Sequence, residues 1–482
     1  MEPKINECSR CAALEEIVLK QQQQIEQLQK AIFGRRSEKK LKSSARPKDP
    51  ANPNEKPEGH GRKKLPDHLP RKRVEHELTG KELLCDECGG EKKRIGEEVS
   101  EQYEFVPASL FVIEHVCGKY ACPCCGNGVT SAAKPMQPIE KGLAGPGLLA
   151  HVATSKYADH LPLNRQEGIL SRHGVDIARS TMCDWMAQVA DLALPLYDLM
   201  KKRTLCSDVI HTDDTPVRVL DRSLEKTRTG RFWVYAGDRL NPYDVFDYTP
   251  NRARDGPIAF LGVTKGLIPA PGEYTGYLHA DAYRGYDGIY AGEKIIELAC
   301  WAHARRKFAE AESSEPIACG EALSQIGLLY AVEAEAKLLS PEERCKLRQA
   351  RSKPTLDQFR AWLEEHRTNV LPRGPLGNAI SYALSNWAAL VRYVENGNLA
   401  IDNNLAERKL RCIAVGRNNW TFVGSDRGGR TAAILITLIS SAKRHGHDPF
   451  AYLRDVFTRI SAHPANKLDE FLPDHWKPPS NE

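Results

Sequence analysis

The chain has 482 residues, 41% hydrophobic and 27% charged, so it can build packed cores, and its length suggests about three domains. No stretch approaches the roughly 20 uncharged apolar residues of a membrane-spanning helix. The N-terminal Met-Glu-Pro-Lys-Ile-Asn lacks the basic-then-apolar layout of a secretory signal. We therefore expect a soluble cytoplasmic protein without a membrane partner. It has 14 cysteines, and those paired at fixed spacing point to metal binding rather than disulfides.

The first segment has a helical apolar repeat. Its apolar positions alternate between spacings of four and three residues, interrupted by one glutamine: Leu14, Val18, Gln21, Ile25, Leu28 and Ile32. This is the spacing of a coiled coil. Residues 1–33 are therefore predicted to form a leucine-zipper-like helix, with an amphipathic helix that does not self-associate as the alternative.

The net charge of +5 is concentrated in the next segment. Between Gly34 and Arg73 there are 14 Lys and Arg against 5 Asp and Glu, together with six prolines and few large apolar residues. Such a composition cannot bury a core, so residues 34–76 are predicted to be a basic linker. A cationic arm of this kind binds polyanions by releasing their counterions, although many basic linkers are merely solvated.

Two Cys-x-x-Cys pairs follow, and they predict a zinc site. The predicted ligands are Cys85, Cys88, Cys122 and Cys125, since four thiolates suit tetrahedral zinc. Cys117 and Cys124 are spare thiols that could replace a ligand, and Cys8 and Cys11 have no second pair and stay unassigned. The resulting module, residues 77–132, is expected to be structural rather than catalytic.

The pattern from Gly145 to about Met200 is helical. A helix over residues 165–173, a Gly174-Val175 turn and a second helix capped near Ser180 resemble a helix-turn-helix. Two packed helices are also common in proteins that do not bind DNA, so the DNA-binding role of residues 145–203 is one of two interpretations.

After Cys206 the pattern changes to extended segments. We predict strands over residues 208–220, 231–236, 243–248, 276–281 and 294–300, with a helix over 252–261 between the third and fourth. This is an α/β pattern, in which ligands gather at strand ends. Asp213 and Asp281 fall at such ends, although aspartate is also a common turn and cap residue.

A third acid, Glu407, lies far downstream in a basic setting. Residues 401–444 contain eight Lys and Arg against three Asp and Glu. Asn404 and Glu407 have the spacing of a helix capping box, which is the structural alternative to a catalytic role for Glu407. Carboxylates that converge among basic residues suit two divalent cations held against phosphate, with arginines positioning the phosphate backbone.

Several segments resemble, in order, the transposases of the insertion-sequence-66 family. They are His211-Thr-Asp-Asp-Thr-Pro-Val, Leu278-His-Ala-Asp-Ala-Tyr-Arg-Gly-Tyr, Cys300-Trp-Ala-His-Ala-Arg-Arg-Lys-Phe, Asp402-Asn-Asn-Leu-Ala-Glu-Arg, Val415-Gly-Arg-Asn-Asn-Trp and Gly424-Ser-Asp-Arg-Gly-Gly. The likeness also takes in the N-terminal zipper, the cysteine module and the tail from His445 to Arg454, and thus nearly the whole chain.

The resemblance implies a DDE transposase with a ribonuclease-H-like α/β core, in which Asp213, Asp281 and Glu407 are the catalytic residues and hold Mg²⁺ or Mn²⁺, two ions in all. The family usually has Asp-Glu-Thr at the first site, and this chain has Asp213-Asp214-Thr215, so Asp214 remains the alternative ligand. Alternation places the two aspartates on opposite faces of a strand.

The resemblance also points to neighbours of the predicted active site. His211 and His303 are either active-site neighbours or core histidines, and Arg408, Arg411 and Arg417 are candidate DNA contacts. The expected partners are DNA (transposon ends and target), further copies of the chain in a synaptic complex, and small accessory proteins of the same element. In action the protein would be associated with the bacterial nucleoid.

The predicted organisation therefore has a catalytic core over residues 204–308 and 396–445, interrupted by a helical insertion over 309–395 and followed by a helical tail over 446–482. The predicted activity is cleavage at transposon ends and joining of the 3′-hydroxyl to target DNA. Two alternatives stay open: a metal-dependent nuclease without strand transfer, and a catalytically inactive DNA-binding regulator.

Overall fold

The computed structural model describes residues 110–115, 119–120, 130–131, 136–140, 142–221, 223, 225–263, 272–282, 284–291 and 294–478. The chain divides into two compact units, Met1–Ile113 and Glu114–Glu482, and nearly all described residues belong to the second. The predicted zipper, linker and four zinc ligands lie outside the described residues. Among the described residues of the predicted zinc module, a short antiparallel pair joins β1 (Lys119–Tyr120) to β2 (Thr130–Ser131).

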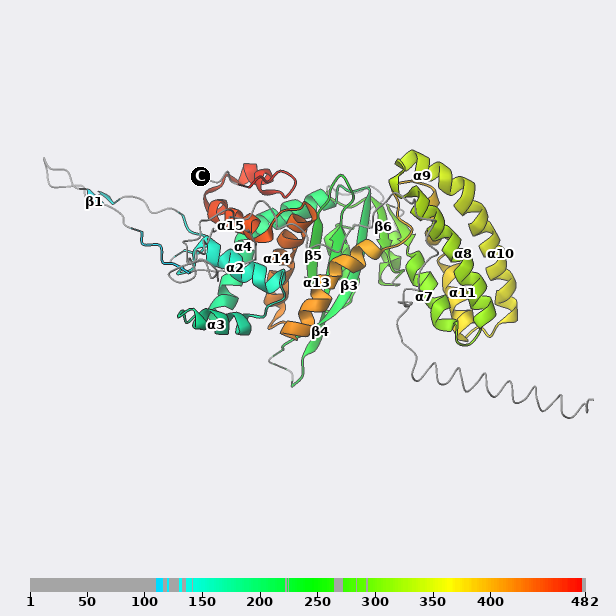
Figure 1. Ribbon diagram of the computed structural model, residues 1–482, viewed down its shortest axis with the longest axis horizontal. Helices are drawn as coiled ribbons and strands as arrows, with labels where there is room; N and C mark the ends of the chain where they lie inside the picture. Colours follow the sequence, from blue (N-terminus) through cyan, green and yellow to red (C-terminus); the bar gives the residue numbers. More distant parts are fainter. Residues whose placement is uncertain are drawn as a thin grey trace, which may run out of the picture. The chain divides into compact units, whose positions relative to one another are not determined.

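A five-stranded mixed sheet forms the centre of the second unit, in the order β5-β4-β3-β6-β7 (Figure 1). β3, β4 and β5 pair antiparallel, whereas β3, β6 and β7 pair parallel. The five strands lie at the predicted places: β3 Val209–Val219, β4 Arg228–Ala236, β5 Asp244–Thr249, β6 Gly276–Ala280 and β7 Ile295–Ala299. The α/β expectation is therefore confirmed, as a mixed sheet covered by many helices.

Two long helices near the C-terminus cover one face of this sheet, α13 (Asn404–Trp420) and α14 (Asp426–Arg444). α14 also protects the edge strand β5, because the Thr437 hydroxyl accepts a hydrogen bond from the Phe246 N–H and the Ser441 hydroxyl one from the Asp244 N–H. Edge-strand groups satisfied in this way are closed to pairing with another chain.

The opposite face carries short helices in the connections between strands. They are α5 (Asp255–Leu261), η2 (Arg284–Tyr286) and α6 (Asp287–Tyr290). The Phe260 ring stacks on Tyr235 with centroids 3.6 Å apart, and Tyr286 lies edge-on to Trp233. These aromatic contacts bury the second face of β4, so the sheet has apolar cover on both sides.

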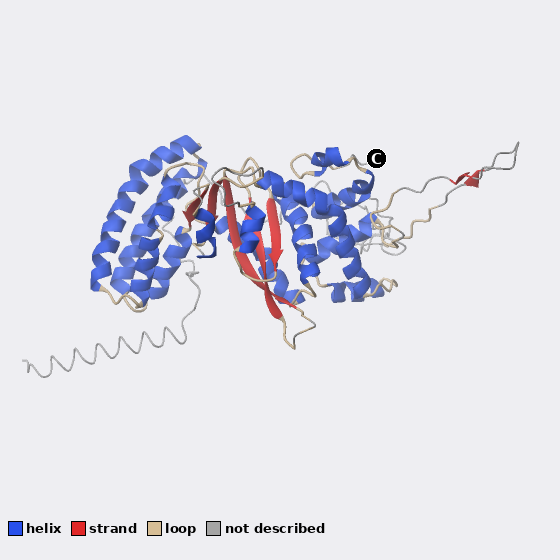
Figure 2. Cartoon of the chain, turned by 180° about the vertical axis from the view of Figure 1, so that it is seen from behind, coloured by secondary structure: helices blue, strands red, loops and turns tan. Residues whose placement is uncertain are grey.

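Helices also pack beyond each edge of the sheet, as both views show (Figures 1 and 2). On the β5 side lie α2 (Pro146–Tyr157), α3 (Leu163–Arg172), α4 (Arg179–Thr204) and α15 (Pro449–Arg459), followed by the short η6 (Ile460–Ala462) and η7 (Ala465–Phe471). The Ser180 cap is wrong: α4 begins at Arg179, and its first N–H is bonded by Glu167 of α3 instead. α4 also runs past Pro195 to Thr204.

On the β7 side, a second apolar core is built around Trp301 at the start of α7 (Trp301–Ala311). The Trp301 indole donates to the Leu390 carbonyl at 2.8 Å and thereby ties α7 to the helices that precede α13. Those helices are α8 (Pro316–Glu335), η3 (Ala336–Leu338), α9 (Pro341–Leu347), the π-helical η4 (Arg348–Ser352), α10 (Lys353–Asn369), α11 (Pro375–Ser385), α12 (Trp387–Val391) and η5 (Arg392–Val394). No described helix is long and apolar enough to cross a bilayer.

This helical core contains a buried ion pair that can be tested against an exposed one. The Arg348 guanidinium is 1% exposed and binds Glu333 through two bonds of 2.7 and 2.8 Å. Glu333→Gln leaves that charge without a counterion and should cost about 3 kcal/mol. Glu335→Gln, on the same helix but in the exposed pair with Arg351, should cost less than about 1 kcal/mol. Urea unfolding followed by tryptophan fluorescence measures both, and equal shifts would contradict this ranking.

Candidate active site

The pairing of β3 with β6 sets the positions of the first two acids. His211 is the register partner of His279, and an aspartate follows each of them two residues later. Asp281 directly follows the end of β6, as expected, whereas the expectation that Asp213 ends its strand is wrong, because β3 continues to Val219. Asp213 therefore lies within β3, beside the point where Asp281 leaves β6. Neighbouring strands are about 4.8 Å apart, so parallel register alone brings these two carboxylates together.

Asp213 is crowded by negative charge. Its Oδ1 accepts a hydrogen bond from the Asp214 N–H at 2.7 Å, which favours the ionised form. Burial has the larger and opposite effect, and together with the charges of Asp281, Asp214 and Glu407 it raises the pKa of Asp213 to about 7. The structure thus brings all three sequence-predicted acids into one electrostatic cluster, and a cation that bound there would relieve their repulsion.

Asp214 lies on the opposite face of β3 and is already engaged. Its Oδ2 accepts from Arg231 at 2.7 Å, and its Oδ1 accepts from Arg252 at 2.8 and 3.0 Å. Its side chain is only 3% exposed. Because both oxygens are bonded to guanidinium groups on the far face, the geometry favours Asp213 over Asp214 as a metal ligand.

Glu407 lies one turn into α13, and the capping box suggested by its spacing from Asn404 is wrong. The helix begins at Asn404, whose side chain bonds Asp402 at 2.7 Å instead. Glu407 keeps a side chain 32% exposed, with its Oε1 3.7 Å from His303 Nε2 and 3.9 Å from Arg306 Nη2. Both separations exceed hydrogen-bond length, so the carboxylate is not consumed by capping the helix.

Asn403 is a site residue that the sequence analysis missed. Its Nδ2 donates to the Thr212 carbonyl at 2.8 Å, so its Oδ1 is the acceptor for His211 Nδ1 at 3.1 Å. This fully buried amide joins the start of α13 to β3 directly beside Asp213. The run Asp402-Asn403-Asn404 could have revealed it, because two adjacent asparagines at a helix start point in different directions and one of them can face the sheet.

The histidines divide into two environments. His211 and His279 are buried with ring centroids 4.8 Å apart, and burial lowers the pKa of His211 to about 4 and that of His279 further below its usual value. Both are therefore neutral near pH 7. His303, at the start of α7, is half-buried, and burial also lowers its pKa, against the opposing charge of Glu407. His303 thus lies beside Glu407 at the edge of the acid cluster, whereas His211 is buried in β3, two residues before Asp213.

The basic side chains of α13 point in different directions, some toward solvent and one toward β3. Arg408 and Arg411 are exposed and face solvent. Arg417, predicted as a DNA contact, instead donates to the Thr215 hydroxyl at 2.9 Å and to the Pro216 carbonyl at 2.8 Å. Those bonds tie the far end of α13 to β3, so the guanidinium has a structural use that the sequence pattern did not indicate.

The donor chemistry of the cluster fits magnesium. Carboxylate oxygens are the ligands that Mg²⁺ prefers. The pKa of Asp213 is raised mainly by burial and further by the charges of the other acids, which a bound cation would counter. Within the described residues, no three His, Cys, Asp or Glu side chains already converge on a single metal position. The side chains of Asp213, Asp281 and Glu407 would therefore have to move toward an ion when it binds.

Comparisons with known proteins point to one family along most of the chain. Three family models match: the transposase IS66 family over residues 141–431, the zinc-finger binding domain of transposase IS66 over 82–126, and the IS66 C-terminal element over 437–473. Among curated proteins, y4hP of Sinorhizobium fredii is 33% identical over 86% of this chain and 77% of its own length. From the same organism, y4jD is 34% identical over 86% of this chain and 81% of its own. Both are named as uncharacterized proteins.

The raised pKa of Asp213 predicts a pH-dependent stability. An unfolded Asp ionises near pH 4, whereas the folded Asp213 ionises near pH 7, so the folded state binds more protons between these values and loses stability as the pH rises. Asp213→Asn should remove this loss. Melting temperatures at pH 5 and pH 8, on zinc-loaded protein without Mg²⁺, measure it. An Asn variant with the same pH dependence as the wild type would contradict the assignment.

Proposed function

Because the chain belongs to the IS66 family of transposases, we propose that it is a DDE-type DNA transposase that cleaves transposon ends and joins them to target DNA. The observation that carries the proposal is the electrostatic cluster of Asp213, Asp281 and Glu407. We assign these three acids as the ligands of two Mg²⁺ or Mn²⁺ ions. Asp214, engaged with two arginines, is excluded from that set in the proposal.

The sheet supports a ribonuclease-H-like core. When its five strands are numbered 1 to 5 along the chain, their order across the sheet is 3-2-1-4-5. The second strand is antiparallel to the first, and the last two are parallel to it. The acids stand on the first strand, directly after the fourth, and on the helix that follows the fifth strand and a long helical insertion. In the proposal, the core comprises residues 204–308 and 396–445, with the insertion at 309–395.

Bound divalent ions would supply Lewis-acid activation of the attacking oxygen and neutralise charge on the phosphate. The chain itself holds the acids in place: Asp213 and Asp281 come from adjacent strands, and Glu407 approaches from α13. In the first reaction, water attacks the phosphodiester at a transposon end, and the bond to the 3′-oxygen breaks to leave a 3′-hydroxyl. That hydroxyl then attacks a target phosphate, forming one phosphodiester and releasing the adjoining 3′-oxygen.

Nearby basic and helical elements are assigned to DNA. Arg408 and Arg411, exposed one and four residues after Glu407, would contact phosphates beside the acids. The helix pair α3 and α4 would act as a helix-turn-helix, since Arg179, at the exposed start of α4, has the position from which a second helix reads base edges. These contacts would select transposon ends.

The N-terminal segments complete the proposal. The zinc module over residues 77–132 would assist recognition of ends, the basic linker over 34–76 would add affinity for phosphates, and the zipper over 1–33 would join copies of the chain in a synaptic complex. Accessory proteins of the same element are further proposed partners. The match of the IS66 zinc-finger model to residues 82–126 supports the first assignment.

Substitution of the acids tests the catalytic assignment. Asp213→Asn, Asp281→Asn and Glu407→Gln should each reduce both cleavage and joining by at least about 100-fold, because even outer-shell changes at metal sites cost about 10–100-fold. Binding of end DNA should persist. Glu310→Gln, an exposed acid on α7, is the matched control. Gel assays with labelled ends, uncut and pre-cut, measure both reactions in Mg²⁺.

The same assay separates the alternatives. Hydrolysis without joined products from pre-cut ends would identify a nuclease instead of a transposase. Specific binding with no reaction of the wild type in Mg²⁺ or Mn²⁺ would identify a DNA-binding regulator. If Asp214→Asn abolished the reaction and Asp213→Asn did not, Asp214 and not Asp213 would be the metal ligand.

The zinc assignment predicts a separable defect. The donors Cys85, Cys88, Cys122 and Cys125 suit structural Zn²⁺, so Cys85→Ser should lower the zinc content and weaken end binding. The Mg²⁺-dependent stabilisation of the core should remain, because the acids lie on other elements. Zinc analysis, gel shifts and melting temperatures with and without Mg²⁺ measure the three effects. Loss of the Mg²⁺ effect together with zinc would contradict separate sites.

A further inference from the structure

A row of register partners across the central sheet contacts the start of α13 at two residues. Asp244 on β5 is the register partner of Ala236 on β4, which is the partner of His211 on β3. Register partners point to the same face of a sheet. Asp244 and His211, two polar members of this row, therefore face α13 together.

His211 provides the first contact, through Asn403. The amide of Asn403 bonds both the His211 ring and the Thr212 carbonyl. In addition, its backbone N–H donates to the Cys300 sulfur at 3.2 Å. These three bonds hold the beginning of α13 against β3 and Cys300, four residues before Glu407.

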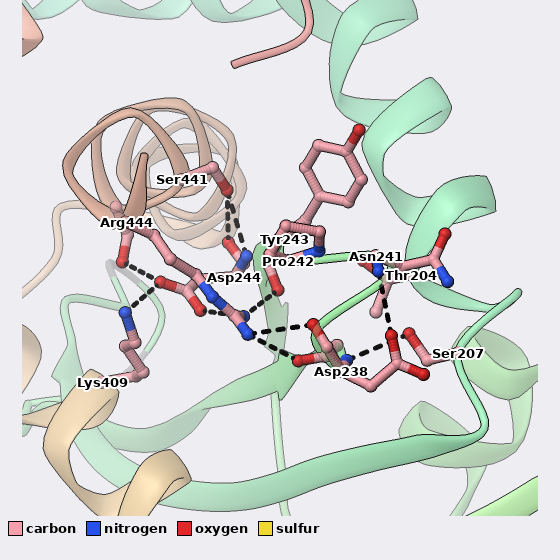
Figure 3. A network of polar contacts seen from close by, with 12 residues as sticks. Thr204, Ser207, Asp238, Asn241, Pro242, Tyr243, Asp244, Lys409, Ser441 and Arg444 are labelled. Atoms are coloured by element: carbon pink, nitrogen blue, oxygen red, sulfur yellow. Dashed lines mark hydrogen bonds and ion pairs between the residues drawn. The ribbon is translucent and has the colours of Figure 1, made fainter. Parts of the chain in front are cut away.

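Asp244 provides the second contact, through Lys409, which Figure 3 shows reaching from α13 to the edge strand. The Lys409 ammonium lies 2.6 Å from Asp244 Oδ2, and Arg444 of α14 lies 2.9 Å from Oδ1. The Asp244 side chain is 0% exposed, and Ser440 donates a further hydrogen bond to it at 2.8 Å. A carboxylate buried this deeply requires such partners.

The two cations on Asp244 have different further partners. Arg444 also donates to the carbonyls of Tyr243, Gly237 and Asp238, so it binds the β4–β5 turn whether or not Asp244 is present. Lys409 has Asp244 as its ion-pair partner, and its side chain is 22% exposed. The ion pair is therefore the contact that joins the second turn of α13 to β5.

Glu407 lies between these two contacts, and we propose that Lys409 is a positioning residue for the metal site rather than a phosphate contact. With Asn403 held at one side and Lys409 at the other, rotation of α13 about its axis is blocked, and Glu407 stays directed toward Asp213 and Asp281. The inference rests on the proposed assignment of those acids as metal ligands. By sequence alone, Lys409 is one of the eight Lys and Arg of the basic region over residues 401–444.

Lys409→Met tests the inference and should fold, because Asp244 keeps Arg444 and Ser440 as partners. We expect Mn²⁺ binding, measured by electron paramagnetic resonance on zinc-loaded full-length protein, to weaken about 10-fold or more, as for other outer-shell changes. The Mn²⁺ binding that remains in the Asp281→Asn variant measures binding at places other than the three acids, and it is subtracted. The Mg²⁺ concentration for half-maximal cleavage should rise in parallel, and Lys409→Arg should restore part of both.

DNA affinity distinguishes the two roles of Lys409. A positioning residue leaves the dissociation constant for end DNA and its salt dependence unchanged. Arg408→Met, one residue away and exposed, is the contrasting variant: it should weaken DNA binding and reduce the salt slope by about one unit with Mn²⁺ binding intact. Lys409→Met that behaves like Arg408→Met overturns the inference, as does Lys409→Met without any effect on Mn²⁺.

Asp244→Asn provides an independent test of the ion pair. It should weaken Mn²⁺ binding to the same extent as Lys409→Met, and the double variant should be no worse than either single one, because both remove the same contact. Additive effects would contradict the inference. A wild-type chain that binds Mn²⁺ at the three acids but joins no ends contradicts the proposed transposase activity and leaves the positioning comparison valid.

Discussion

The parallel pairing of β3 with β6 is the constraint on which the candidate site depends. This register places Asp213, within β3, beside Asp281, which directly follows β6. Burial, together with the charges of the neighbouring acids, raises the pKa of Asp213 to about 7. An arrangement that costs folding free energy in the absence of a cation is the kind found at functional sites, where the ligand compensates the cost.

The third acid depends on how a helix is held against that sheet. α13 is bonded to the sheet at three points: Asn403 at its start, Lys409 in its second turn and Arg417 at its end. Each bond reaches a different position, on β3 or β5, so the helix cannot slide or turn freely. Glu407 needs no bond of its own to be directed, since the helix that carries it is fixed on both sides.

The basic residues around Glu407 consequently have two functions. Arg408 and Arg411 are exposed beside the acids, where a phosphate backbone would lie in the proposed reaction. Lys409 and Arg444 bind the buried Asp244 carboxylate, and Arg417 binds the Thr215 hydroxyl and the Pro216 carbonyl of β3. A count of charges along the sequence combines both groups and so overstates the surface available to DNA.

The sequence by itself determined the order of strands and helices, the three acids and the family, because these depend on local periodicity and on motifs read along the chain. It did not determine which of two adjacent asparagines faces the sheet, whether Glu407 caps its helix, or that Asp214 is held by Arg231 and Arg252. Nor could it separate Lys409 from Arg408. Only the tertiary structure decided these points, since each depends on which groups from distant segments lie within hydrogen-bond reach, and neither spacing nor composition encodes that distance.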